Sequence, residues 1–97
     1  MHIQIYGRPM CSSCEAAIEL VERNGYYFDY NNVDLMRFDE VIRIVEQRKN
    51  KENRDLPIIF IDGREVETLD ELREYFERMA SKNTGLGNSL STPEQLD

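Results

Sequence analysis

Both cysteines of the chain lie two residues apart, within residues 6–14. They stand between a short apolar run, residues 3–6, and a segment whose apolar residues have helical spacing. We therefore expect Cys11 where a strand passes into a helix. Unpaired backbone N–H groups at a helix start carry partial positive charge, which stabilises a thiolate and lowers the pKa of the Cys11 thiol. Arg8 adds a positive charge nearby, so Cys11 is the expected attacking thiol and Cys14, one turn further, the resolving one.

Two other uses of the cysteine pair are a structural zinc site and a permanent disulfide. A structural zinc site needs four ligands, and His2 is the only other soft ligand in the chain. A permanent disulfide is rare in the cytosol, and a bridge across so short a loop removes little entropy from the unfolded chain. A C-x-x-C pair beside a strand–helix–strand pattern is typical of a redox site. We therefore favour thiol–disulfide exchange and expect no metal.

The chain has 97 residues and a net charge of −7, from 12 basic and 19 acidic residues. This length predicts one domain with a modest core. The acidic balance argues against nucleic acid as a partner, because phosphate binding depends on Lys and Arg, and it favours solubility. No apolar stretch is long enough to span a bilayer, and residues 1–4 lack the apolar core of a signal peptide. We expect a monomeric cytoplasmic protein that does not bind membranes.

Hydrophobic periodicity and turn residues predict an α/β fold in the order βαβαββα. Strands are expected at residues 3–6, 26–33, 56–61 and 64–67, and helices at 12–24, 40–49 and 68–80. Gly25 suits the end of the first helix, and Asp39 is the expected cap of the second. Thr68 with Glu71 forms a capping box for the third helix. The result is a four-stranded mixed sheet covered by three helices.

Two further segments differ in composition from these elements. Residues 48–55 form a polar loop that is the most basic part of the chain. Residues 81–97 contain turn-forming residues and no sustained apolar period, so we expect a flexible C-terminal tail after a domain of residues 1–80.

Residues 1 to about 80 resemble the glutaredoxin family, which has a thioredoxin-like fold. Three features carry the resemblance: the strand–Gly7-Arg8-x-x-Cys11-x-x-Cys14–helix pattern, the apolar strand opened by Leu56-Pro57, and the start of the last helix at residues 68–72. The resemblance implies a dithiol oxidoreductase. Its first cysteine attacks a disulfide, and the mixed disulfide is resolved by Cys14 or by glutathione.

The resemblance also implies a binding site for glutathione, which would act as a co-substrate with no tightly bound cofactor. Pro57 would follow a cis peptide bond, so that the Leu56 backbone could pair with the extended ligand. Arg8 would hold a glutathione carboxylate. The γ-glutamyl end would lie at the helix start, where backbone N–H groups suit a carboxylate. The implied binding residues are Arg8, Leu56, Pro57, Leu69 and Asp70, with Arg48 or Lys49 adding charge.

Two departures from the family pattern bear on glutathione. Ser12-Ser13 stands between the cysteines, where glutaredoxins usually have Pro-Tyr, so the tyrosine of the glutathione groove is missing. Glu67-Thr68 replaces a Gly-Gly pair that lets the ligand approach the backbone. We therefore predict glutathione binding that is weaker than in a typical glutaredoxin.

The main prediction is a glutathione-dependent reductant of protein or mixed disulfides. The alternative is a redoxin that donates electrons to ribonucleotide reductase and is itself reduced by thioredoxin reductase, since residues 1–35 and Leu56-Pro57 also resemble such redoxins. A carrier of a [2Fe–2S] cluster, and a binding module with incidental thiols, are the weaker hypotheses.

Overall fold

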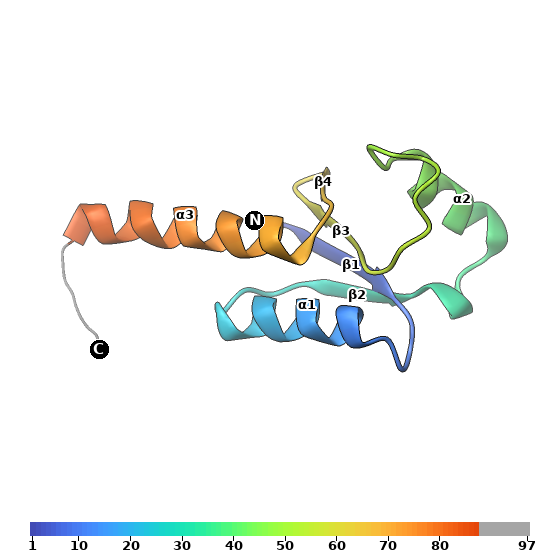
Figure 1. Cartoon of the computed structure of the whole chain (residues 1–97), viewed down its shortest axis with the longest axis horizontal. Helices are drawn as coiled ribbons and strands as arrows, with labels where there is room; N and C mark the ends of the chain where they lie inside the picture. Colours follow the sequence, from blue (N-terminus) through green and yellow to red (C-terminus); the bar gives the residue numbers. More distant parts are fainter. Residues whose placement is uncertain (88–97) are drawn as a thin grey trace.

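The computed structural model describes the backbone of residues 1–87 and the side chains of residues 1–80 (Figure 1). In chain order, the elements are β1 (Ile3–Gly7), α1 (Ser12–Arg23), β2 (Asp29–Asn32), the 3-10 helix η1 (Val33–Leu35), α2 (Phe38–Glu46), β3 (Ile58–Ile61), β4 (Arg64–Val66) and α3 (Leu69–Gly87). The predicted order of strands and helices is confirmed, with η1 as an additional helical turn. None of the described helices is both long and apolar enough to cross a membrane.

The four strands form one mixed sheet in the order β2-β1-β3-β4. β1 pairs in parallel with β2, with Ile5 opposite Tyr30, because α1 carries the chain from the end of one strand back to the start of the other. β3 pairs antiparallel with β1 and with β4. The β3–β4 hairpin turns at Asp62 and Gly63, whose φ angles of 51° and 84° are those of the tight hairpin turn that Asp-Gly favours.

The helices cover both faces of the sheet, as the alternation of side chains along β3 requires. Ile59 and Ile61 face α1 and α3, in a core that also contains residues such as Val21 and Leu72. Ile58 and Phe60 face the other way, and half-buried residues of η1 and α2 pack on this second cluster. Figure 1 shows α3 continuing well beyond the sheet.

The boundaries of several elements differ from those expected, and β3 begins at Ile58, two residues later than expected. β2 begins at Asp29 because the preceding Tyr26 leaves the sheet and stacks on the ring of Phe76, with 5.1 Å between ring centroids. α2 begins at Phe38, so Asp39 lies inside its first turn and does not cap it. α3 continues past residue 80 to Gly87. The remainder of the expected tail, residues 88–97, lies outside the described part of the chain.

Candidate active site

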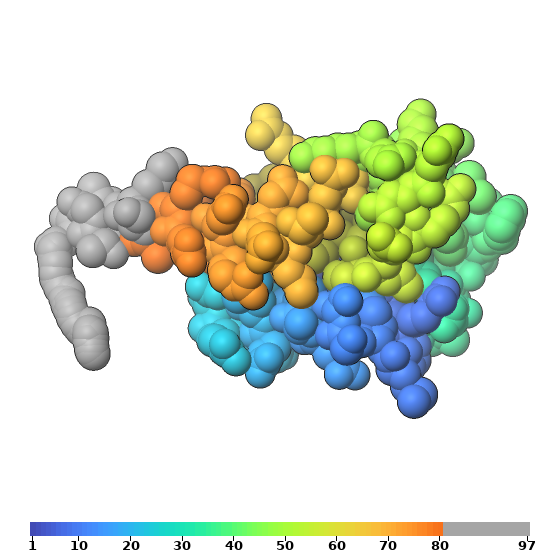
Figure 2. All heavy atoms as spheres, in the orientation of Figure 1, coloured from blue at the N-terminus to red at the C-terminus, as the bar shows by residue number. Residues whose placement is uncertain are grey.

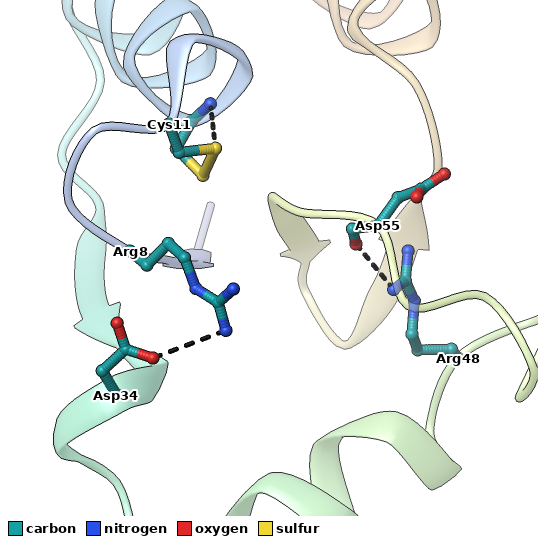
Figure 3. Close-up of a disulfide and its surroundings, with 6 residues drawn as sticks. Arg8, Cys11, Asp34, Arg48 and Asp55 are labelled. Carbon is teal, nitrogen blue, oxygen red and sulfur yellow. Dashed lines mark hydrogen bonds and ion pairs between the residues drawn. A yellow bond between two sulfur atoms is a disulfide. The ribbon is translucent and has the colours of Figure 1, made fainter.

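Cys11 lies at the N-terminal end of α1 and is joined to Cys14 in a disulfide, with 5.2 Å between their Cα atoms (Figure 3). Its extended backbone, with φ −116° and ψ 105°, places the sulfur over the first helical turn. The Cys11 Sγ accepts the N–H of Cys14 at 3.2 Å, as the side chain of a helix cap does. Cys14 is only 1% exposed, whereas Cys11 is half-buried. An external disulfide therefore reaches Cys11 more easily.

Gly7 lets the end of β1 pack directly against the disulfide. A Cβ at Gly7 would lie 2.8 Å from the Sγ of Cys14, closer than such atoms approach in proteins. The sequence motif contained Gly7, but only the structure supplies this reason for it.

The neighbouring Tyr6 belongs to the core, and its burial, with a smaller contribution from the Asp29 carboxylate, raises the pKa of its hydroxyl above the ordinary 10.0. Tyr6 is therefore neutral at physiological pH.

An open groove of about 640 Å³ lies beside the cysteine loop. Ser13 lines it at the start of α1, Leu56 and Pro57 line it before β3, and Leu69 and Asp70 line it at the start of α3. Figure 2 shows these three parts of the chain, coloured blue, yellow-green and orange, meeting on one face of the molecule. Four of the predicted binding residues are thus brought together, and the Leu56–Pro57 peptide bond is cis, as predicted.

Several backbone groups along this groove are free to bind a ligand. Within the described residues, the Leu56 backbone and the N–H groups of Leu69 and Asp70 make no hydrogen bond. The next N–H along α3 is capped by Thr68 Oγ1 at 3.1 Å, as predicted. The Glu71 carboxylate, however, accepts the N–H of Glu67 at 2.7 Å and not that of Thr68. Free N–H groups at a helix start suit a carbonyl or carboxylate oxygen.

Arg8 does not line this groove. Its guanidinium pairs with the Asp34 carboxylate of η1 at 3.4 Å, and both side chains are about half exposed (Figure 3). Sequence reasoning did not identify Asp34 as the partner, because the two residues are far apart in the chain. The expected carboxylate contact of Arg8 is therefore not supported by its position in this structure.

Carboxylates dominate the charge of the groove. Asp55, Glu67 and Asp70 line it, and Arg48 is the one cation among its lining residues. Arg48 is buried and paired with Glu65 at 2.9 Å, so its charge is already compensated. The sequence predicted Arg48 in a polar, basic loop at the end of the second helix, adding charge for a ligand, and did not indicate Glu65 as its partner. Lys49 lies outside the groove and faces Glu71 at 3.9 Å.

The remaining metal-binding hypothesis concerned His2. In the structure its Nε2 lies 2.9 Å from an Asp29 oxygen, at the end of β1 opposite to the cysteines. Among the described residues, no group of three or more His, Cys, Asp or Glu side chains could hold a metal ion.

The mixed sheet, its covering helices and the C-x-x-C disulfide at a helix start define a thiol–disulfide oxidoreductase with a thioredoxin-like fold. The family model described as Glutaredoxin matches residues 3–66, about two thirds of the sequence. The chain belongs to the glutaredoxin family. Its recognition from sequence, and the prediction of an enzyme, are thereby confirmed.

Solved structures agree with this assignment. Glutaredoxin 1 from Francisella tularensis, complexed with cacodylate, is 20% identical, with a TM-score of 0.61 over 82% of this chain and 96% of its own. The glutaredoxin-like protein NrdH-redoxin from Escherichia coli is 25% identical, with a TM-score of 0.60 over 81% and 95%. A buckwheat glutaredoxin–glutathione complex is 17% identical, with a TM-score of 0.62 over 87% and 74%. No curated protein matches the sequence significantly.

Proposed function

We propose that the chain reduces protein disulfides and mixed disulfides through Cys11 and Cys14. The Cys11 thiolate attacks one sulfur of the substrate disulfide and forms a mixed disulfide, while the other substrate sulfur leaves as a thiolate. The Cys14 thiolate then attacks the Cys11 Sγ and releases the second substrate thiol. The substrate gains two electrons, and the enzyme is left with the Cys11–Cys14 disulfide.

The observation that carries this proposal is the unequal placement of the two sulfurs. Cys11 is the more accessible cysteine, and its Sγ accepts a backbone N–H at a helix start, which stabilises a thiolate. Cys14 is buried one turn further along α1. This arrangement suits attack by Cys11 and resolution by Cys14.

The charge of the groove favours a protein reductase of the thioredoxin reductase class as the electron source. Glutathione carries a net negative charge at neutral pH, whereas Asp55, Glu67 and Asp70 line the groove and Arg8 lies elsewhere. The E. coli NrdH-redoxin, described as having a thioredoxin-like activity profile, supports the same choice. We further propose ribonucleotide reductase as a protein substrate and the cytoplasm as the location.

Glutathione is the second candidate, because the free N–H groups of Leu56, Leu69 and Asp70 line the groove as donors. The buckwheat glutaredoxin, which shares the fold, forms a complex with glutathione. Two molecules of glutathione would reduce the Cys11–Cys14 disulfide and leave as glutathione disulfide. We expect glutathione to reduce the protein at a measurable but low rate.

A coupled assay tests both parts of the proposal. The oxidised protein is given a peptide disulfide and NADPH, with either thioredoxin reductase or glutathione and glutathione reductase. We expect faster turnover in the first arm and none with Cys11→Ser. Cys14→Ser should lose turnover in the first arm and retain reduction of glutathione mixed disulfides. Turnover by Cys11→Ser would contradict the assignment of the nucleophile, and a faster second arm would contradict the choice of electron source.

Neutralising the groove tests the role of its charges. Asp55→Asn combined with Glu67→Gln should raise kcat/KM with glutathione several-fold, because each exposed charge contributes up to about 1 kcal/mol. Glu77→Gln, which removes an exposed charge of α3 outside the lining of the groove, is the matched control. An equal gain from the control would show that only net charge matters.

A further inference from the structure

Arg48 and Glu65 form a buried ion pair that joins three segments beside the groove. Each side chain is only 1% exposed, and the Nε of Arg48 lies 2.9 Å from Oε2 of Glu65 on β4. The Nη1 of Arg48 also donates to the carbonyl oxygen of Asn53 at 3.1 Å. It donates to the carbonyl oxygen of Asp55 at 2.9 Å as well (Figure 3). The second oxygen of Glu65 accepts the N–H of Lys49 at 2.7 Å. One guanidinium thus connects the end of α2, the edge strand and the loop before β3.

Stability alone does not account for this arrangement. Burying two charges is costly, and a pair of well-packed apolar side chains is often as stable or more so. Apolar side chains, however, could not donate to the carbonyl groups of Asn53 and Asp55. The planar fork of Arg48 can bind a carboxylate on one edge and these carbonyls on another. The property that requires an arginine here is its hold on the loop.

The hydrogen bond from Arg48 to the Asp55 carbonyl oxygen determines the direction of the Leu56 N–H. The peptide between Asp55 and Leu56 is trans, since the described cis bond is that between Leu56 and Pro57. In a planar trans peptide the C=O and N–H bonds point in opposite directions. The Asp55 carbonyl points toward Arg48, so the Leu56 N–H points away from it. Leu56 lines the groove, and its N–H has no partner in the described part of the chain.

We propose that Arg48, held by Glu65, is a positioning residue that orients the Leu56 N–H toward peptide-borne disulfide substrates. The substrate class is an extended peptide whose backbone carbonyl accepts this N–H while its disulfide faces Cys11. The inference rests on the proposed reduction of such disulfides in this groove. Glutathione is itself a peptide that would use the Leu56 N–H, so the two substrates are compared with thioredoxin reductase as the electron source.

The other hydrogen bonds of this loop provide a matched control. The Arg54 side chain donates to the carbonyl of Lys51, and Asn53 Oδ1 accepts the N–H of Asp55 at 2.8 Å. These contacts shape the loop from within and do not attach it to α2 or β4. Arg54→Met therefore removes an arginine from the same loop and leaves the contacts of Arg48 in place.

The test compares two substrates in the full-length protein, namely a peptide disulfide and bis(2-hydroxyethyl) disulfide, which has no peptide backbone. The main variant combines Arg48→Met with Glu65→Leu, because removing both charges together avoids an unpaired buried charge. We expect kcat/KM for the peptide to fall about three- to tenfold, through a higher KM, as for the loss of one well-placed hydrogen bond. The rate with the small disulfide and the pH profile of Cys11 alkylation should not change. Arg54→Met should affect neither substrate.

A second variant and a direct measurement keep the test decisive. Arg48→Lys keeps the charge opposite Glu65 but loses the fork, and it should show the same selective loss for the peptide. In both variants, NMR should show a shifted and faster-exchanging Leu56 amide. An unchanged ratio between the two substrates, or equal losses for both, would overturn the inference while leaving the proposed function intact. Failure of the wild-type protein to reduce either substrate would instead refute the proposed function and remove the basis of the inference.

Discussion

At the scale of single residues, neighbouring side chains in the fold give the two cysteines different properties. The Cys11 Sγ lies at the end of α1, accepts the Cys14 N–H and is partly open to solvent. Cys14 is enclosed between its own helix and Gly7. A thiolate is stabilised at the first position and shielded at the second, which is the asymmetry that a dithiol reductant needs.

The contact between Gly7 and Cys14 leads to the first prediction. Gly7→Ala should lower the free energy of unfolding of the oxidised protein by about 1–3 kcal/mol, because the new methyl group must displace Cys14 Sγ or the end of β1. Urea unfolding measures this difference. Ser12→Ala, at the exposed first residue of α1, is the control and should have a smaller effect. Equal stability of Gly7→Ala and the wild type would show that the backbone relaxes without cost.

At the scale of elements, three chain segments meet to form the groove. The first turn of α1 brings Ser13, next to the disulfide, and the segment before β3 brings Leu56 and Pro57. The start of α3 brings N–H groups that make no hydrogen bond within the described residues. The sheet order β2-β1-β3-β4 makes this possible, because β1 and β3 are neighbours and antiparallel. The end of β1 therefore lies beside the start of β3. Glu65 on β4 then reaches the end of α2 through Arg48.

The buried pair predicts a large effect of a single substitution on stability. Glu65→Ala should lower the free energy of unfolding by about 3–5 kcal/mol, because it leaves Arg48 charged and buried without its carboxylate. Glu19→Ala is the control, because it breaks an exposed ion pair in which the Glu19 carboxylate lies 3.2 Å from the Arg23 guanidinium. It should lower the free energy of unfolding by at most about 1 kcal/mol. Urea unfolding at neutral pH compares the two. A similar loss of unfolding free energy in both variants would mean that water reaches the Arg48 guanidinium and solvates its unpaired charge.

At the scale of the whole molecule, we propose that folding and catalysis do not require the end of the chain. The family match ends at residue 66, and the large apolar residues that α3 contributes to the core, Leu72 and Phe76, precede residue 80. We propose that residues 1–80 contain the groups needed for folding and catalysis. This proposal includes the disulfide, the groove and both clusters of the core.

Truncation after Ala80 tests that proposal. The shortened protein should lose little stability and keep its rate of disulfide reduction, because it retains Leu72 and Phe76, the buried core residues of α3. Thermal unfolding and the coupled reduction assay provide the two measurements. A second truncation after Phe76, which removes the rest of α3, locates the boundary. A large fall in melting temperature on removing residues 81–97 would show that this segment contributes to the folded unit.

Local patterns in the sequence were sufficient to predict much of the fold. The apolar run before Asp62-Gly63, the Thr68 cap and the cysteine pair at a helix start each depend on neighbours within about one turn of chain. The boundaries of β2 and α2 were less well predicted. There, packing of Tyr26 on Phe76 and the additional turn η1 override the local preferences. Element ends are decided by such tertiary contacts.

The sequence by itself determined that the chain is a dithiol protein of the glutaredoxin type, because the chemistry of a C-x-x-C pair depends on its short spacing and on the adjacent helix. Only the tertiary structure decided which charges surround that pair. Arg8 pairs with Asp34, and Arg48 pairs with Glu65, 17 residues further along the chain. Such pairings follow from the order of strands and the packing of helices, and periodicity along the chain does not encode them. The physical reason is that a charge acts on its neighbours in space, at distances of a few ångströms, whatever their separation in sequence.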